Sequence, residues 1–295
     1  PRFLKNPVLF LGSLIFYAWG VPAYVAVILF SVVFNYMCGL WMGKCAKSRK
    51  KSKRVLFIST TVNVAVAAAC YIGARWLPFP MGIGVYTLLA ISYMMDLYRK
   101  EARVQKNFLD FAVYMTLFPL LPAGPVAQYK DMASQLHSRK ESWGKRGDGA
   151  FAFIRGLAKK VLLAGMADGL FQSVQALEAG EVSMLSAWLG CAAFAFYVYF
   201  SFSGYADMAV GLGKIFGFQL PENFHYPYGA KSIVEFWQRW NITVSVWFQN
   251  YVYAPLGGNK GSAARTVCNI LLVWLGLGHP EAAGRGTGQH KRERN

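Results

Sequence analysis

The chain has 295 residues, of which 55% are hydrophobic and only 15% are charged, and its 31 basic and 14 acidic side chains give a formal net charge of +17. Soluble domains carry about 25% charged residues, and disordered chains are poor in hydrophobic residues, so the composition argues against both classes. The basic residues lie in short runs between long apolar segments. This pattern argues against a nucleic-acid binder and is typical of a multi-pass membrane protein.

The first third of the chain contains a series of apolar segments. About 20 apolar residues are needed to cross a bilayer. The segment 8–19 is shorter than this and the sequence begins at Pro1 rather than Met, so we expect the N-terminal end to be a cut within a longer protein. Three longer segments follow and are predicted to span the membrane: 22–42, which contains the polar Asn35, 55–74 and 81–97.

Two basic loops separate these spans and predict their orientation. Residues 44–54 include seven basic side chains and no acid, and residues 99–106 are basic again. The positive-inside rule places both loops in the cytoplasm, at the plasma (inner) membrane. Two spans lie between the two loops, so the topology is self-consistent. An anionic-lipid or nucleic-acid patch is the alternative interpretation of residues 44–54.

The middle of the chain is predicted to be less regular. Residues 108–126 are apolar but contain Pro119, Pro122 and Pro125, which predicts a re-entrant or broken segment rather than a straight span. Residues 128–149 read as a polar loop. Residues 151–172 and 183–202 are predicted to be helices at membrane depth, the second of them strongly aromatic.

Polar, aromatic, Gly and Pro residues are interleaved in the segment 201–260. At about 100° per residue, one helical face of 233–251 collects the apolar side chains, which predicts an amphipathic helix, or two short ones in phase, lying in the membrane interface. Asn241 falls at the margin of that face, where its carboxamide either is a satisfied core group or orients a ligand. The apolar face comprises Ile233, Phe236, Trp237, Trp240, Val244, Trp247, Phe248 and Tyr251.

Other catalytic signatures are lacking in the sequence. There is no GxSxG elbow, no HExxH and no phosphate-binding glycine loop. The five cysteines are scattered without CxxC spacing, so we expect neither a disulfide framework nor a metal site. Among the four histidines, His279 directly follows the last apolar run.

Several long motifs in the right order carry a resemblance to a known family. The segment 202–260 resembles the core of the membrane-bound O-acyltransferase family, closest to its alginate O-acetyltransferase branch, and the likeness extends over about residues 8–277. The motifs are FSGYADMAVGLGKIFGF, LPENFHYPY, FWQRWNITVSVWF and YAPLGGNK, with LIFYAWG, MGIGVYTLLAISYMMDLYRK, FPLLPAGPVAQY and RGLAKKVLLA upstream.

The resemblance implies an all-α, multi-pass membrane fold with re-entrant and interfacial helices. Residues 1–277 would form a single, partial transmembrane domain. Residues 278–295 turn polar and Gly-rich and are expected to be a tail foreign to the family. The family places its essential histidine in a Gly-Leu-Trp-His-Gly motif. Here His279 takes that place, but Gly278 and Pro280 stand where the Trp and the second Gly are expected.

The resemblance also implies roles for particular residues. His279 would be the catalytic base and Asn241 would orient substrate or stabilise an oxyanion. Lys214 and Arg239 would attract phosphates of the donor, although both equally suit membrane anchoring. A substrate tunnel would be lined by Tyr205, Asp207, Trp237, Arg239 and Trp240.

The implied reaction is transfer of an acyl group, in this branch acetyl, from a cytoplasmic thioester to hydroxyls of an exported polysaccharide such as alginate. The donor would be acetyl-CoA or an acyl-carrier thioester, with no bound cofactor and no metal. The expected partners are membrane lipid, the polysaccharide acceptor and periplasmic or extracellular acetylation proteins, but no nucleic acid. The altered histidine motif and the absent later helices predict that this chain is inactive or impaired.

Two other classes of function stay open. A transporter or channel would explain the multi-pass layout and the Pro-rich break, and Asp207 is the best candidate for its ion path because intramembrane acids mark such paths. A non-catalytic fragment that binds partners in a polysaccharide-secretion complex is the third reading. Dependence on the charge of Asp207 would favour transport, whereas a structural dependence would favour acyl transfer.

Overall fold

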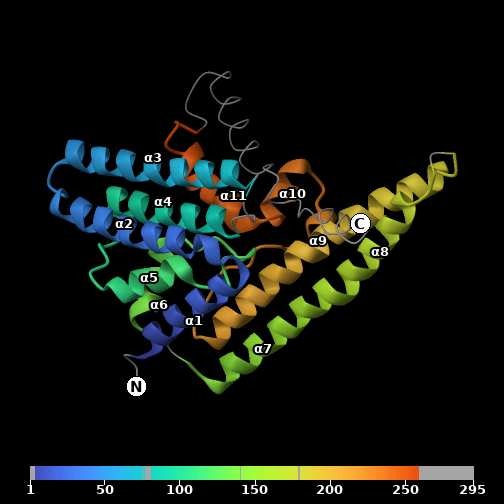
Figure 1. The fold of residues 1–295 in the computed structure, drawn as a ribbon, viewed down its shortest axis with the longest axis horizontal. Helices are drawn as coiled ribbons and strands as arrows, with labels where there is room; N and C mark the ends of the chain where they lie inside the picture. The colour runs from blue at the N-terminus through green and yellow to red at the C-terminus, as the bar shows by residue number, and fades with distance from the viewer. Residues whose placement is uncertain (1–3, 75, 77–80, 140, 179, 259–295) are drawn as a thin grey trace.

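A computed structural model describes residues 4–74, 76, 81–139, 141–178 and 180–258. Within these residues the chain forms helices and connecting turns without a β-strand, which confirms the all-α prediction. Figure 1 shows a cluster of helices built from the first part of the chain and a long helical hairpin that projects from it.

The helix cluster begins with α1 (Lys5–Gly20), a short 3-10 turn at Pro22–Tyr24, and α2 (Val25–Lys44). The basic run 44–54 is not a loop throughout, because α3 (Arg49–Gly73) begins inside it. The side chain of Ser48 caps α3 by accepting a hydrogen bond from the Lys51 amide. These helices match the predicted segments 22–42 and 55–74.

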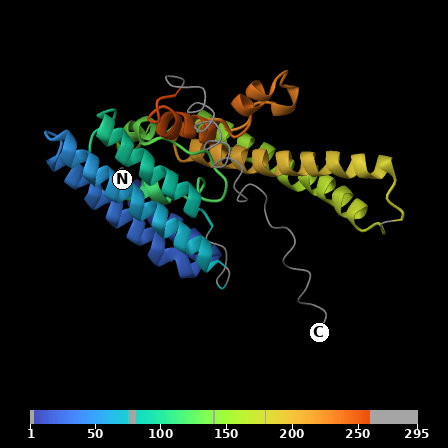
Figure 2. The same ribbon diagram turned by 90° about the horizontal axis from the view of Figure 1, so that it is seen from above.

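The helix α4 (Ile83–Arg99) is the centre of the cluster. Eleven of its 17 residues are buried, so it is enclosed by its neighbours on most sides. It packs mainly against α2 and α3, as both views show (Figures 1 and 2). A buried all-round apolar surface is what a central helix needs, and this position explains the near-continuous hydrophobicity of the segment 81–97.

The Pro-rich segment is broken as predicted. The helix α5 (Phe108–Thr116) ends before Pro119, and residues 117–128 run without regular structure into α6 (Tyr129–His137). The prediction of a loop over 128–149 was wrong in two places, because α6 lies inside it and α7 (Trp143–Ala158) starts in it. Side-chain caps from Asn107 and Ser142 start α5 and α7.

The projecting hairpin consists of two long arms. The first arm is α7, a π-helical turn at Lys159–Leu163 and α8 (Ala164–Gln175); the second is α9 (Met184–Ile215). The α8 end of the hairpin extends away from the cluster in both views (Figures 1 and 2). The sequence predicted an end near residue 202, but α9 continues to Ile215 because its glycines pack tightly on α7 instead of breaking the helix.

The segment 233–251 forms two short helices, which is the second of the two predicted alternatives. The short helices α10 (Ile233–Arg239) and α11 (Ile242–Phe248) are separated by a turn, and a π-helical turn at Gln249–Tyr253 continues α11. Within the described residues, three helices are long and apolar enough to cross a membrane: Pro22–Lys44, Arg49–Gly73 and Met184–Ile215. Residues 259–295, with His279 and the predicted tail, lie outside the described residues.

Candidate functional site

A cavity of about 330 Å³ lies where the cluster, the hairpin and the 240–248 segment meet. Its lining comes from six parts of the chain. These are Ala67 of α3, the start of α4 with the residues just before it (81–88), the Pro-rich segment (121–126), Phe202 of α9, the loop residues Asn223 and Phe224, and the turn with α11, namely Trp240, Asn241, Val244 and Phe248. Two residues predicted for the site, Trp240 and Asn241, are therefore brought together on one wall.

The turn between α10 and α11, which contains these two residues, has an unusual backbone conformation at Asn241. The side chain of Ser232 caps α10, and the Trp240 amide donates to Phe236 O at 2.9 Å to end it. Asn241 then adopts a left-handed conformation with φ of 43°. Asparagine is one of the few non-glycine residues that tolerate this region, so the residue type suits the turn as well as the cavity.

A buried polar bridge holds the turn in place. The side-chain oxygen of Asn223 accepts hydrogen bonds from the Thr243 amide (3.0 Å) and hydroxyl (2.8 Å). The Val126 amide donates to the same hydroxyl at 2.9 Å. The Ile242 amide donates to the Asn223 carbonyl at 2.9 Å. The bridge joins three walls of the cavity, and it was missed by sequence reasoning even though Asn223 lies in the quoted LPENFHYPY motif.

Aromatic rings fix the orientation of Trp240. Its indole packs edge-on against Phe224 with 5.1 Å between centroids and stacks on Phe236 at 5.5 Å. Tyr228 also contacts this group, and its hydroxyl donates to Ala195 O of α9 at 2.9 Å. Burial raises the pKa of Tyr228, so it remains a neutral hydrogen-bond donor. Trp240 therefore lies among aromatic side chains, and its role in a substrate tunnel stays a prediction.

A second network attaches α11 and the turn after it to α4. The indole N–H of Trp247 donates to Ser92 Oγ at 2.9 Å. The Tyr251 hydroxyl donates to Asp96 Oδ1 at 2.6 Å, and the Lys130 amide donates to Asp96 Oδ2 at 3.0 Å. Asp96 is completely buried. These partners attach the cavity wall to the helix cluster, and no local sequence pattern pairs them.

The other residues predicted for the tunnel lie elsewhere. Asp207 forms ion pairs with Lys159 Nζ at 2.8 Å and Arg155 Nε at 3.3 Å, both on the facing arm of the hairpin. The ring of Tyr205 lies 5.2 Å from Lys160 Nζ. These contacts hold α9 against the first arm, and neither residue is among those that line the cavity.

On the short helix, Arg239 Nη2 pairs with Glu235 at 2.6 Å, and Trp237 packs edge-on against Phe236. Lys214 lies in the last turn of α9, where a cation favours the helix dipole. None of these three lines the cavity, so their tunnel and donor-binding roles stay predictions. In the described part of the chain no three His, Cys, Asp or Glu side chains form a group suited to a metal.

Comparison with known proteins gives the chain a consistent set of relatives. The sequence model of the membrane-bound O-acyltransferase family matches residues 26–277. A probable alginate O-acetylase of Pseudomonas syringae pv. tomato is 37% identical over 303 residues, which cover 93% of this chain and 57% of that protein. A peptidoglycan O-acetyltransferase of Helicobacter pylori is 31% identical, covering 96% of this chain and 62% of the relative.

A more distant relative is a teichoic acid D-alanyltransferase of Bacillus subtilis, 25% identical over 180 residues that cover 59% of this chain and 44% of that protein. The chain thus spans about 57–62% of the length of the two nearer relatives named above. The cavity-lining residues of the described structure all lie inside the matched range 26–277.

Proposed function

Since this chain belongs to the membrane-bound O-acyltransferase family, we propose that it carries the transfer site of an enzyme that acetylates hydroxyls of an exported polysaccharide such as alginate. The observation that carries the proposal is the cavity at Trp240 and Asn241, whose walls are joined by a buried polar bridge and packed aromatic rings. The names of the relatives support the reaction class, because they describe transfer of acyl groups to cell-surface polymers.

The proposed chemistry uses one base and one hydrogen-bond donor. The imidazole of His279 takes the proton from the attacking hydroxyl, whose oxygen forms the new ester bond with the thioester carbonyl carbon. The carbon–sulfur bond then breaks, and the sulfur leaves as a thiol after taking the proton that the imidazole had accepted. Imidazole suits this role because its pKa lies near working pH. The Asn241 carboxamide would donate to the oxygen that gains charge, an interaction worth a large share of many rate enhancements.

The donor and the placement in the cell are part of the same proposal. Acetyl-CoA or an acyl-carrier thioester would reach the site from the cytoplasm, and the polysaccharide and any periplasmic acetylation proteins would meet it from the other side of the inner membrane. The basic residues near 44–54 and 99–106 support this orientation. In a cysteine-free background, Lys100→Cys should resist a membrane-impermeant maleimide added outside, whereas Trp76→Cys should react; the reverse pattern would invert the topology.

The ion pairs of Asp207 weigh against the transporter alternative. A carboxylate that Lys159 and Arg155 neutralise joins two helices instead of offering a free charge to a passing ion. Asp207→Asn should therefore lower the stability of the hairpin without creating or removing any ion flux in reconstituted vesicles.

The histidine motif makes the proposal testable in this chain. Gly278 and Pro280 replace the Trp and Gly that the family resemblance predicts beside His279, so the parent chain should turn over slowly. The change Gly278→Trp with Pro280→Gly should raise acetyl ester formation on alginate from acetyl-CoA in membranes. Adding His279→Ala should abolish the gain. Ester formation that never exceeds that of empty membranes would contradict the proposal.

Two substitutions separate the catalytic role of the Asn241 carboxamide from the role of its backbone in the turn. Both are made in the chain with the restored histidine motif, Gly278→Trp with Pro280→Gly. Asn241→Gly keeps the left-handed turn, because glycine adopts positive φ freely, but it removes the carboxamide. We expect turnover to fall by about 10²-fold with unchanged thermal stability. Asn241→Ala should lose stability as well, since a Cβ without a polar group disfavours this conformation. Full activity in the glycine variant would exclude the proposed donor.

A further inference from the structure

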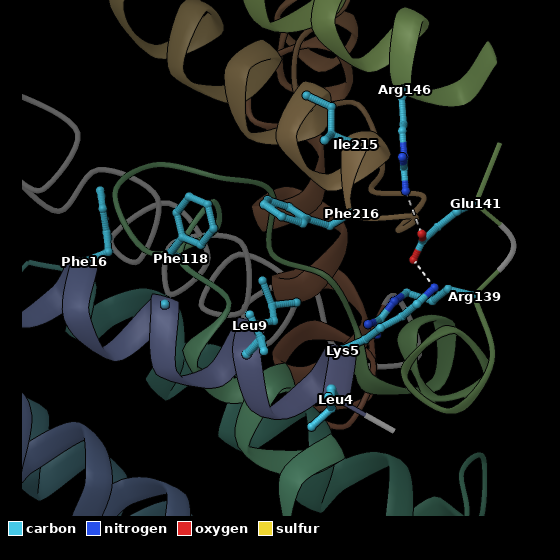
Figure 3. A pocket seen from close by; sticks show the side chains of 12 residues that line it. Leu4, Lys5, Leu9, Phe16, Phe118, Arg139, Glu141, Arg146, Ile215 and Phe216 are labelled. Atoms are coloured by element: carbon cyan, nitrogen blue, oxygen red, sulfur yellow. Dashed lines mark hydrogen bonds and ion pairs between the residues drawn. The ribbon is translucent and has the colours of Figure 1, made fainter. Parts of the chain in front are cut away.

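A groove of about 860 Å³, separate from the candidate site, runs along one face of α1 (Figure 3). Most of its wall is apolar. On the α1 side it comprises Leu4, Val8, Leu9, Gly12 and Phe16, and on the opposite side Phe118, Ile215 and Phe216. From the first to the last of the α1 residues the groove is about 18 Å long, at about 1.5 Å of rise per helical residue.

One end of the groove is strongly polar. Figure 3 shows Lys5, Arg139, Glu141 and Arg146 together at this end, with Phe16 and Phe118 at the other. Glu141 is already engaged, because it accepts from Lys5 Nζ at 2.6 Å and from Arg146 Nη2 at 2.9 Å. Three cations therefore face a single carboxylate at the groove end. A neighbouring cavity of about 1130 Å³ shares all four residues.

Arg139 forms no ion pair within the described residues, although the carboxylates of Glu141 and Asp110 act on it from a longer distance. Its Nη2 donates to Asn6 Oδ1 at 2.7 Å, and its guanidinium lies 4.3 Å from the centroid of the Phe218 ring. Its Nε and Nη1 atoms are buried and find no acceptor among the residues that the structure describes. Burial lowers the pKa of this guanidinium. Buried N–H groups of a charged side chain are costly when they stay unpaired, so this end of the groove is suited to receive an anion.

We propose that the groove binds one anionic phospholipid, with its phosphate accepting hydrogen bonds from Arg139 and an acyl chain lying along α1. The guanidinium group matches phosphate oxygens in charge and geometry. The apolar wall favours a lipid over a free anion. On the same helix, Val8, Leu11 and Ile15 are themselves 65%, 57% and 68% exposed. The groove therefore opens on an apolar surface that suits the hydrocarbon of a membrane.

Gly12 offers a way to block the groove without disturbing the fold. A Cβ at this position would meet no atom within 4 Å, so a large side chain has room to enter the groove. Gly165 of α8 is equally open and does not line the groove. Gly12→Phe and Gly165→Phe are therefore a matched pair of substitutions, since both place a bulky ring on an exposed helix.

The test is lipid retention by the full 295-residue chain, purified in detergent with phosphatidylglycerol or phosphatidylcholine and measured by native mass spectrometry. We expect one retained phosphatidylglycerol per chain and at least tenfold weaker retention of phosphatidylcholine. Arg139→Gln should reduce this preference about tenfold, and Gly12→Phe should abolish retention of both lipids, whereas Gly165→Phe should behave as the parent.

Three results would overturn the proposal. The first is equal retention of the two lipids by the parent chain. The second is unchanged retention of phosphatidylglycerol in Gly12→Phe, which would place the lipid elsewhere. The third is displacement of the lipid by millimolar inorganic phosphate, which would make the charged end a site for a free anion. A circular dichroism spectrum equal to that of the parent shows for each variant that lost binding is not lost folding.

Discussion

The side-chain amides of Asn35 and Asn63 form a reciprocal hydrogen-bonded pair between α2 and α3. Asn35 Nδ2 donates to Asn63 Oδ1 at 2.9 Å, and Asn63 Nδ2 donates back to Asn35 Oδ1 at 2.8 Å. Ser59 adds a hydrogen bond to Asn35 at 3.0 Å. Buried polar groups without partners are costly in a membrane, and the pair satisfies both amides while it fixes the register of α2 against α3.

Replacing one of the two asparagines should lower the free energy of unfolding by more than half of what replacing both does. We expect Asn35→Leu to lower the free energy of unfolding by roughly 1–2 kcal/mol, because it leaves the Asn63 amide underpaired in an apolar setting. The double change Asn35→Leu with Asn63→Leu should cost less than the sum of the two single changes. Reversible unfolding in mixed micelles measures all four proteins, and strictly additive losses would show that the amides do not interact.

At this scale the sequence predicted residues but not their partners. Asn35 was visible as the one strongly polar residue of its span, yet nothing in the pattern pairs it with Asn63. The helical period places Asn241 at the margin of an apolar face. It does not predict the left-handed backbone of Asn241, because the neighbouring hydrogen bond to Asn223 comes from a loop about 20 residues earlier in the chain. Contacts between distant segments decide both cases.

Between elements, α7 and α9 pack backbone against backbone through glycines. A Cβ on Gly204 would lie 2.8 Å from Gly156 O, and one on Gly156 would lie 2.6 Å from Gly204 O. Such approaches allow no side chain, which is the usual device for close helix packing in membranes. The ion pairs of Asp207 with Arg155 and Lys159 flank the same contact.

We therefore expect Gly204→Leu to separate the two arms of the hairpin and to lower stability by roughly 1–3 kcal/mol through overpacking. Gly165→Leu is the matched control, because a Cβ there meets nothing within 4 Å and leucine favours a helix more than glycine. Its stability should equal or exceed that of the parent. Unfolding followed by circular dichroism compares the three chains, and equal stability of both variants would contradict the packing argument.

The attachment of α1 to the loop before α7 is predicted to be sensitive to acid. The hydrogen bond from Lys5, helped by Arg146, lowers the pKa of Glu141 from its ordinary value of 4.5. A carboxyl whose pKa is lower in the folded state stabilises the fold fully above its unfolded pKa, and this contribution is lost as the pH falls through the folded value. Stability should thus decline below about pH 4.5.

Hydrogen exchange of the first turn of α1 at pH 7 and pH 3 measures this effect. Glu141→Gln should remove the part of the pH dependence that comes from Glu141, and Lys5→Met should weaken it. Because the pair is partly exposed, salt should reduce the effect. A pH response of α1 that is identical in parent and Glu141→Gln would assign it to another group.

The elements show where local patterns suffice and where they fail. Apolar length predicted α2 and α3, and three prolines predicted the break after α5. The end of α9 was placed too early, because glycines that usually interrupt helices serve here in close packing with α7. Residues 233–251 have one helical period, but the turn at Asn241 divides them, since the loop at Asn223 competes for the backbone.

Across the whole molecule, the candidate site is assembled from both halves of the chain, and α4 is the element that joins them. Its residues line the cavity at one end, and further along it accepts hydrogen bonds from Trp247 and Tyr251, which follow the turn at Asn241. Arg99 extends the same contact by donating to Asn250 O at 2.7 Å. The position of the cavity wall therefore depends on buried polar groups that never reach the cavity.

Tyr251→Phe tests this dependence, because it removes one hydroxyl and leaves the ring in place. Asp96 keeps only the Lys130 amide on its other oxygen, and a buried carboxylate that loses a donor costs roughly 1–3 kcal/mol. We expect lower thermal stability together with reduced acetyl transfer in the chain with the restored histidine motif. If Tyr251→Phe lost stability but kept full turnover, the wall at Asn241 would be held by the Asn223 bridge without help from α4.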